Sequence, residues 1–239
     1  MKSLVALSVV VSARAGDRPW MNPADPPIDR AKKLVAAMTT EEKLGLFHGS
    51  YCGGGFAGVC GIDRLGVPQQ KFNDGPQGFR GASGTSTSWP ALITVTASFD
   101  TEFMRTYGEA MGDEFYRKGA NVQLGPGMCL ARVPRDGRNF EYLAGEDPYL
   151  SYHMAKAFVT GIQSQGVIAN AKHFVDNNQE SHRFSFTANV DERTQFEMYY
   201  PPFRGAIDAG VGSIMCSYNK ECIDCPTRSA TGRARTTNR

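Results

Sequence analysis

The sequence predicts an α/β fold in which a parallel sheet closes into a (β/α)8 barrel of the TIM type. Short apolar segments alternate with amphipathic helical segments, a pattern typical of parallel strands joined by helical crossovers. Polar clusters follow at least three successive strands, and a barrel gathers its active-site residues at these strand ends. A doubly wound open sheet would instead concentrate its ligand at one switch point, often with a Gly-rich phosphate loop, and the sequence contains no such loop. The barrel is therefore favoured over the open sheet.

The N-terminus has the features of a secretory signal peptide at residues 1–15. Lys2 supplies the charged start, residues 4–11 form a short apolar run, and Ala13-Arg14-Ala15 is a small-x-small cleavage site. A frayed apolar N-terminus on a cytosolic protein is the alternative, because the apolar run is short. No later segment approaches the ~18 uninterrupted apolar residues of a membrane span. We therefore expect a secreted, extracellular protein that makes no membrane contact, with a Pro-rich arm at 16–27.

Two short helices open the part of the chain that we expect to fold as one partial barrel domain, residues 28–219. Thr39 and Glu42 form a capping box at the start of the second helix. The apolar residues of the first helix recur at helical spacing, namely Ile28, Ala31, Leu34, Val35 and Met38.

A repeating unit of strand, polar cluster and helix follows. We expect strands at 71–72, 120–124, 167–171 and 211–216, each ending at a polar residue, glycine or proline. The helices between them are delimited by capping residues, from Asp100 to Gly119, from Asp147-Pro148 to Gly166, and from Asp191 to Gly210 with a break at Pro201-Pro202.

The net charge gives no indication of a nucleic-acid partner, and we expect none. The cysteine content fits an oxidising compartment. The net charge is +2, and residues 220–239 contribute +3 of it (five Lys and Arg against two Asp and Glu), so the rest sums to −1. Cys52 and Cys60 flank a Gly-rich loop, which favours a local disulfide, although spacing alone does not fix the pairing. Cys222 and Cys225 have CxxC spacing but no second pair nearby, and we interpret them as a coincidence.

Three polar clusters carry the candidate chemistry. Asp74 lies on a tight turn at 73–76, for which an ordinary Asx turn is the alternative. Arg138 lies in a loop of mixed charge, for which a merely solvated loop is the alternative. Lys172 and His173 follow an apolar strand, and two cationic groups there carry a desolvation cost that needs compensation. An ordinary strand end at the surface is the alternative for this pair.

A polyhydroxylated ligand suits these clusters best. Each sugar hydroxyl both donates and accepts hydrogen bonds, so carboxylates, cationic donors and an aromatic face can satisfy it together. Phosphate would call for a helix N-terminus or a Gly-rich nest, and a metal for clustered ligands, whereas the four histidines are scattered. We therefore expect neither a metal nor a cofactor. The rim residues are Asp74, Arg138, Lys172, His173, Arg183 and Tyr218.

Four motifs in order resemble glycoside hydrolase family 3. They are Asn-Asp-Gly-Pro-Gln-Gly-Phe-Arg at 73–80, Gly-Arg-Asn-Phe-Glu at 137–141, Ala-Lys-His-Phe at 171–174 with Glu180 and Arg183 after it, and Met-Cys-Ser-Tyr-Asn at 215–219. One such string would be weak evidence, but four in the family's order and spacing are specific. The resemblance covers roughly residues 28–219.

The resemblance implies a β-glucosidase-type enzyme that removes terminal non-reducing β-D-glucosyl residues by a retaining mechanism. It implies that Asp74 binds the O4 and O6 hydroxyls of glucose, and that Arg138, Lys172 and His173 hold the remaining hydroxyls. The Asp-Gly-Pro motif is similar to the β-glucosidase branch and favours glucose over xylose. The implied substrates are β-glucosides or cello-oligosaccharides. The resemblance also implies that Arg80 and Arg183 support the pocket, that Met215 lines it and that Tyr218 lies close to the nucleophile.

The chain departs from the family's pattern after residue 219. The family's nucleophile is the aspartate of a Ser-Asp-Trp motif, which this sequence does not contain, and its acid/base glutamate usually comes from a later domain. A retaining glycosidase needs both carboxylates. Residues 220–239 have no aromatic residue and one large aliphatic residue, which predicts a disordered tail outside the family pattern.

An incomplete barrel and an inactive fragment are therefore expected. The chain lacks the catalytic residues, although the family resemblance identifies an O-glycosyl hydrolase. The alternative is a non-catalytic sugar-binding or decoy protein that uses the residual glucose pocket. Cleavage by an improvised carboxylate pair drawn from Asp74, Glu141, Glu146 and Glu180 carries little weight, because rate depends on finely tuned geometry.

Overall fold

The computed structural model describes residues 18–47, 57–81, 84–143 and 145–223. The predicted signal peptide, Cys52 and the end of the predicted tail lie outside these residues. By contact the chain divides into two units, one formed up to residue 70 and a larger one formed mainly by residues from 71 onward. The larger unit holds the predicted polar clusters.

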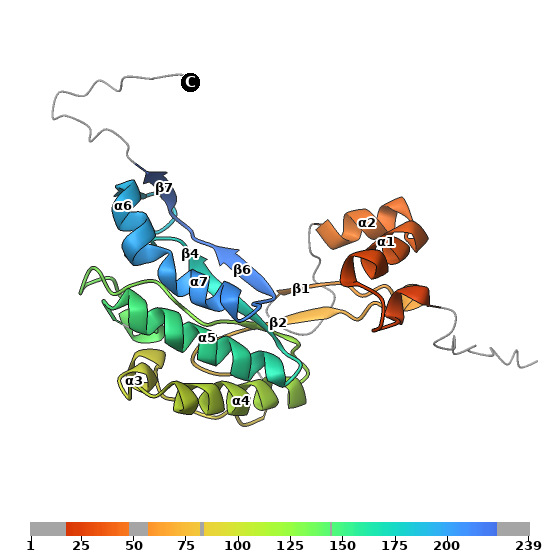
Figure 1. Cartoon of the computed structure of the whole chain (residues 1–239), viewed down its shortest axis with the longest axis horizontal. Coiled ribbons are helices and arrows are strands. Elements are labelled where there is room, and N and C mark those ends of the chain that lie inside the picture. Colours follow the sequence, from red (N-terminus) through yellow and green to blue (C-terminus); the bar gives the residue numbers. More distant parts are fainter. Residues whose placement is uncertain (1–17, 48–56, 82–83, 144, 224–239) are drawn as a thin grey trace, which may run out of the picture. The chain divides into compact units, whose positions relative to one another are not determined.

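The smaller unit is built from short helices (orange in Figure 1). Its capping box is confirmed, since the Thr39 N–H donates to Glu42 Oε2 at 2.8 Å and the Glu42 N–H donates to Thr39 Oγ1 at 3.2 Å. Met38, Ile62 and Leu65 form its buried core. Its elements are η2 (Pro19–Met21), α1 (Pro27–Ala37), α2 (Thr40–Phe47) and η3 (Asp63–Leu65), and strand β1 (Ala57–Val59) lies at the unit boundary.

The larger unit is an α/β structure around a parallel sheet. Its strands follow one another in chain order, each hydrogen-bonded to the next in parallel. A doubly wound sheet would reverse this order at its switch point, so the sheet is consistent with an incomplete barrel. The strands are β2 (Gln70–Asp74), β3 (Val122–Leu124), β4 (Ile168–Phe174) and β6 (Ser213–Cys216).

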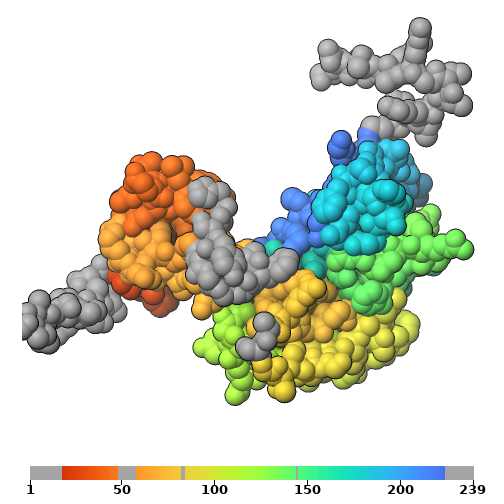
Figure 2. All heavy atoms as spheres, turned by 180° about the vertical axis from the view of Figure 1, so that it is seen from behind, coloured from red at the N-terminus to blue at the C-terminus, as the bar shows by residue number. Residues whose placement is uncertain are grey.

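Helices connect the strands and cover the sheet. The helices α4 (Thr101–Arg117), α5 (Pro148–Ser164) and α7 (Pro201–Asp208) pack in series, each against the next, and α3 (Leu92–Thr96) precedes α4 (Figure 1). Seen from behind, the yellow, green and cyan parts of this unit form one continuous body (Figure 2). The core between helices and sheet is apolar, and its fully buried members include Met104, Phe115, Phe158, Ile162 and Phe203.

The predicted caps of the two long helices are confirmed. The Asp100 carboxylate accepts from the N–H groups of Glu102 and Phe103, and the Asp147 carboxylate accepts from those of Tyr149 and Leu150. These bonds satisfy helix N–H groups that have no partner within the helix. Such caps are local, which is why the sequence alone predicts them.

Three elements differ from expectation. Strand β4 runs to Phe174, so Lys172 and His173 lie within the strand rather than after it. The helix capped by Asp191 is interrupted directly before the two prolines, as predicted, since a new helix, α7, begins at Pro201. The part before the interruption differs from expectation, because it consists of the short α6 (Glu192–Thr194) and a π-helical turn η5 (Gln195–Tyr199). The π turn accommodates Pro201, which has no N–H to donate.

The third difference concerns the predicted disordered tail at 220–239. The prediction is wrong for the first residues of this segment. Lys220–Ile223 forms strand β7, which pairs in parallel with β5 (Thr187–Val190) in a separate two-stranded sheet. Cys60 in the smaller unit takes part in a disulfide, and its predicted partner Cys52 lies outside the described residues. Cys222 in β7 takes part in a disulfide as well. Backbone pairing and a covalent link can order a segment that buries little apolar surface, and composition alone does not reveal either.

Glycines allow α4 and α5 to approach closely. A Cβ on Gly161 would lie 2.2 Å from the Arg105 carbonyl oxygen, and one on Gly108 would lie 2.7 Å from the Phe158 carbonyl oxygen. Neither oxygen can move without moving its helix. The two helices therefore pack at a distance that only glycine permits at these positions.

We expect Gly161→Ala to lower the free energy of unfolding by about 2 kcal/mol, because the added methyl group must push α4 away from α5. Chemical denaturation measures the change. The matched control is Thr160→Ala at the exposed neighbouring position, which should change stability by less than about 0.5 kcal/mol. Equal effects of the two substitutions would contradict the close approach.

Candidate functional site

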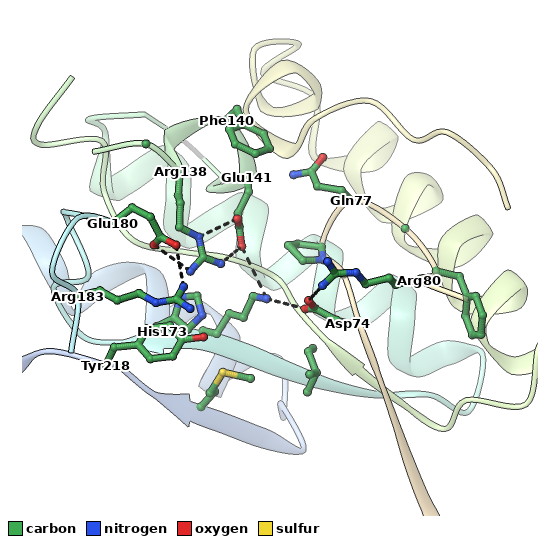
Figure 3. Close-up of a pocket in the computed structure, with 18 residues that line it drawn as sticks. Asp74, Gln77, Arg80, Arg138, Phe140, Glu141, His173, Glu180, Arg183 and Tyr218 are labelled. Carbon is green, nitrogen blue, oxygen red and sulfur yellow. Dashed lines mark hydrogen bonds and ion pairs between the residues drawn. The ribbon is translucent and has the colours of Figure 1, made fainter. Parts of the chain in front are cut away.

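The predicted polar clusters surround one cavity in the larger unit, with a volume of about 740 Å³ (Figure 3). All eight residues that the sequence analysis assigned to substrate binding line it, namely Asp74, Arg80, Arg138, Lys172, His173, Arg183, Met215 and Tyr218. They come from the ends of three strands of the sheet and from the loops between the strands. The carboxyl ends of parallel strands meet at one edge of a sheet, which explains why residues so far apart in sequence converge.

Asp74 is the last residue of β2 and accepts two cationic partners. Arg80 Nη1 donates to its Oδ2 at 2.9 Å, and Lys172 Nζ donates to its Oδ1 at 3.2 Å. The loop after it is held by Asn73, whose side-chain amide donates to the Arg80 carbonyl and accepts from the Arg80 N–H, both at 2.8 Å. Gly75 has φ +148°, and a Cβ there would lie 2.2 Å from the Gly78 carbonyl oxygen. The turn therefore requires glycine directly after the carboxylate.

Lys172 is a buried cation shared between two carboxylates. Its side chain is 4% exposed, and Nζ lies 3.2 Å from Asp74 Oδ1 and 3.7 Å from Glu141 Oε1. These two carboxylates supply the compensation for burial that was expected of a cation at this strand end. Lys172 and His173 are consecutive, yet both line the cavity because the pairing of β4 with β6 shifts register between Ala171 and Phe174.

Arg138 is held by two glutamates. Its Nε and Nη2 donate to the two oxygens of Glu141 at 3.0 and 2.7 Å, and Nη1 lies 3.5 Å from Glu180 Oε2. Burial acts to lower the pKa of the guanidinium, but the Glu141 hydrogen bonds and the two negative charges hold that pKa above its usual value. Arg138 therefore stays charged and rigidly oriented. Glu141 ends the short helix η4 (Asn139–Glu141) that begins after Arg138.

His173 is a neutral ring at the base of the cavity. It is 1% exposed, and burial lowers its pKa to about 2, helped by the positive charges of Lys172, Arg138 and Arg183. Its Nδ1 lies 3.3 Å from the Tyr142 hydroxyl. An imidazole in this position can bind a ligand hydroxyl but cannot supply a positive charge at neutral pH.

Arg183 and Tyr218 form the wall opposite Asp74. Arg183 Nη1 donates to Glu180 at 2.8 Å, and its guanidinium lies 4.1 Å from the centre of the Tyr218 ring. The Tyr218 and His173 rings are 5.1 Å apart. Tyr218 is 36% exposed and lines the cavity, so part of this side chain is accessible to a ligand.

Ten further residues line the cavity and were given no binding role in the sequence-based prediction, and four of them present charged, amide or exposed aromatic side chains. Glu141 and Glu180 each neutralise a predicted cation, and the exposed Phe140 and the amide of Gln77 also face the cavity (Figure 3). The available signal was spacing, since Glu141 follows Arg138 by three residues and Glu180 precedes Arg183 by three. Cations at buried strand ends require such partners.

The part of the chain that the structure describes was searched for metal-binding groups and for membrane-spanning helices. Those residues contain no group of three or more His, Cys, Asp and Glu able to hold a metal ion. Among the described helices, none is both long enough and apolar enough to cross a bilayer.

Asp176 is a buried carboxyl just beyond β4 that the sequence analysis did not consider. It is 1% exposed, and neither oxygen makes a hydrogen bond of good geometry within the described residues. Burial raises the pKa of this carboxyl to about 7, and the negative charge of Glu221 adds to the effect, against a weaker opposing contribution from the Gln195 side chain.

Comparison with known proteins gives consistent results. Residues 62–232 match the family model described as the glycosyl hydrolase family 3 N terminal domain, which extends past residue 219, where we expected the resemblance to end. A beta-glucosidase of Rhizobium radiobacter is 42% identical over 193 residues, covering 78% of this chain and 23% of that protein. Thermostable beta-glucosidase B of Acetivibrio thermocellus is 40% identical over 201 residues, covering 79% and 26%.

Solved structures agree with the sequence relatives. DesR, a beta-glucosidase from Streptomyces venezuelae in complex with D-glucose, superposes with a TM-score of 0.77 at 40% identity, covering 80% of this chain and 25% of that one. Beta-glucosidase 3B from Thermotoga neapolitana in complex with alpha-D-glucose gives a TM-score of 0.74 at 35% identity, covering 80% and 30%. The chain thus spans about a quarter of the length of these relatives.

We expect Lys172→Met to lower the free energy of unfolding by about 3 kcal/mol, because it leaves two carboxylates in the cavity without their shared cation. The exposed helix residue Lys156, changed to Met, is the control and should have an effect below about 0.5 kcal/mol. Denaturation of both variants measures the difference. A Lys172 variant as stable as the control would show that the shared ion pair is not formed.

A second prediction concerns pH and Asp176. In the unfolded chain its carboxyl titrates near 3.9, so the folded state binds the proton more tightly between about pH 4 and 7. Stability from this group is fully present below about pH 4 and is lost as pH rises through 7, by at most about 4 kcal/mol.

Asp176→Asn keeps the shape of the neutral acid and removes the titration. The variant should equal the wild type near pH 4 and exceed it in stability at pH 8, as measured by denaturation at both values. Asp113→Asn, on an exposed face of α4, is the control. Equal pH dependence of wild type and the Asp176 variant would show that this carboxyl is ionised in the folded protein.

Proposed function

The chain belongs to glycosyl hydrolase family 3, and on that premise we propose that its cavity is the glucose-binding pocket of a β-glucosidase. The substrate would be a β-glucoside or cello-oligosaccharide, of which the terminal non-reducing β-D-glucosyl residue occupies the cavity. The single observation that carries the proposal is the convergence of Asp74, Arg138, Lys172 and His173 on one cavity. The relatives named as beta-glucosidases, two of them with glucose bound, support the choice of sugar.

The chemistry of the cavity supports a pyranose as the ligand. Asp74 offers acceptor oxygens, while Lys172, Arg138 and His173 can donate, so hydroxyl groups on one ring can be satisfied in both roles. Tyr218 adds an aromatic face, which matches the C–H face of a sugar. The cavity has no excess of one hydrogen-bonding role, as a phosphate or carboxylate site would have.

We also propose that this chain, by itself, binds the sugar without cleaving it. A retaining glycosidase needs a nucleophilic carboxylate and an acid about 5–5.5 Å from it. The three carboxylates that line the cavity, Asp74, Glu141 and Glu180, are each paired with Arg or Lys. A carboxylate held by a cation is a poor proton donor, so none of the three suits the role of the acid. This argues against an improvised catalytic pair and favours sugar binding as the activity of the isolated chain.

Two further proposals concern architecture and location. Strands in chain order with helical crossovers support a (β/α)8 barrel of the TIM type, of which the described strands are one part. Lys2, the apolar run at 4–11 and the Ala-Arg-Ala site support secretion to the extracellular space. Analysis of the secreted protein's N-terminus would decide the second point, since cleavage after residue 15 is the expected result.

Calorimetric titration with glucose tests the binding proposal. The folded chain should give saturable heat, and Asp74→Ala should weaken affinity at least tenfold, because a hydrogen bond to a charged group contributes about 1.5–3 kcal/mol. Asp113→Asn, remote from the cavity, should bind as the wild type does. A folded chain that releases no saturable heat would contradict the proposal.

An aryl β-glucoside assay tests the proposal that the chain by itself does not cleave the sugar. The purified chain should release no more aryl alcohol than the buffer blank. Turnover that disappears on Asp74→Ala would show that the chain is catalytic and that our reading of the paired carboxylates is wrong.

A further inference from the structure

We propose that Tyr142 and Asn177 fix the tautomer of His173, so that the ring carries its proton on Nε2 and presents that N–H to the cavity as a donor. Both are positioning residues, since they act through His173. The consequence for sugar binding rests on the proposed function, whereas the tautomer itself does not.

The three side chains form a buried hydrogen-bonded series behind the cavity. Asn177 Nδ2 donates to the Tyr142 hydroxyl at 3.1 Å, and that hydroxyl lies 3.3 Å from His173 Nδ1. Tyr142 and Asn177 are 0% exposed and His173 is 1% exposed. The Tyr142 and His173 rings meet edge to face at 84°, with centres 6.2 Å apart. Water therefore has no access through which to replace these contacts.

The direction of each hydrogen bond follows from the donors available. The Asn177 amide hydrogen occupies one lone pair of the Tyr142 oxygen, which leaves the phenol hydrogen to be donated onward. His173 is neutral because it is buried among cations, so exactly one of its two nitrogens carries a proton. If Nδ1 accepts the phenol hydrogen, the proton must be on Nε2.

The phenol hydrogen is firmly retained. Burial raises the pKa of Tyr142 well above its usual value, so the hydroxyl remains a donor at any pH at which the protein is folded. The Cys129 sulfur also lies within reach of the phenol, but sulfur is a weak acceptor compared with an imidazole nitrogen. The ring nitrogen is therefore the preferred acceptor.

One competing arrangement of these hydrogen bonds would give the other tautomer. If the Asn177 amide were reversed, its oxygen would accept the phenol hydrogen, His173 Nδ1–H would donate to Tyr142, and Nε2 would face the cavity as an acceptor. Asn177 Oδ1 has no hydrogen-bond partner among the described residues, so the contact with Tyr142 is what distinguishes the two amide orientations. The two arrangements place the His173 proton on different nitrogens, which is measurable. Orientation of a side-chain amide is assigned from its hydrogen bonds.

The proposed tautomer has a consequence for recognition. Asp74 already supplies acceptor oxygens, so a donor at His173 Nε2 allows the ring to engage the lone pair of a sugar hydroxyl whose hydrogen is donated elsewhere. An acceptor at Nε2 would compete with Asp74 for hydroxyl hydrogens. Tyr142 and Asn177 thus set the hydrogen-bonding role of a residue that lines the cavity.

Two-bond ¹H–¹⁵N correlation spectra of the full chain labelled with ¹⁵N-histidine test the proposal without any sugar. The chain has four histidines, and the His173 signals are those lost in His173→Gln. The expected result is the Nε2–H pattern for His173 throughout the neutral pH range. A spectrum with the proton on Nδ1, or a protonated ring at pH 7, would overturn the proposal.

Tyr142→Phe then tests the cause. The variant should show a mixture of both tautomers and bind glucose more weakly by the inverse of the fraction that keeps the proton on Nε2, which is about twofold for an even mixture. Tyr107→Phe is the matched control, because Tyr107 is buried in the same unit and donates to the Pro90 carbonyl at 2.9 Å, and it should leave the His173 pattern unchanged. Retention of a single Nε2–H pattern in Tyr142→Phe would show that Tyr142 does not fix the tautomer.

Two results separate this inference from the proposed function. If Tyr142→Phe fails to fold, the wild-type spectrum and the milder Asn177→Ala variant decide, with a shift toward Nδ1–H expected for the variant and an unchanged pattern overturning the inference. If the wild-type spectrum shows Nε2–H but glucose gives no saturable heat, the tautomer assignment stands and the sugar-binding proposal fails.

Discussion

The ammonium group of Lys172 is the interaction on which the rest of the site depends. It lies almost completely buried between Asp74 at the end of β2 and Glu141 in the loop after β3, and so links the ends of neighbouring strands. From it, ion pairs extend in both directions in alternating sign. The resulting series of seven residues has four cations and three anions, and runs Arg80, Asp74, Lys172, Glu141, Arg138, Glu180 and Arg183.

This series explains how one set of residues can hold the loops around the cavity and also serve the ligand binding that we propose. A buried charge would destabilise the fold if left alone, and each charge of the series has a partner of opposite sign. Three of the pairs, Lys172 with Asp74, Lys172 with Glu141 and Arg138 with Glu180, join different segments of the chain, and the others are local. The side chains are thereby held in place before a ligand arrives, which reduces the entropy lost on binding. The same pairing occupies the carboxylates, which supports our proposal that the isolated chain binds a sugar without cleaving it.

A feature could be predicted from the sequence when the residues that produce it lie close together in the chain, and could not when they lie far apart. The Asp100 and Asp147 caps depend on residues two or three positions away and could be predicted from spacing, and the rim residues could be predicted because they occur in contiguous motifs. The pairing of β5 with β7 joins backbones more than 30 residues apart through segments with little apolar character, so no local pattern indicated it. The role proposed for Tyr142 and Asn177 could not be predicted from the sequence for a similar reason. It depends on their contact with His173, which no local pattern indicates.

A crystal structure of the chain grown with glucose tests the central claim most directly. The account predicts one pyranose in the cavity, with hydroxyl oxygens within about 3.2 Å of Asp74, Lys172 and His173, and with the Lys172 ammonium still between Asp74 and Glu141. Glucose bound at a different surface, or a Lys172 side chain turned away from both carboxylates, would contradict it.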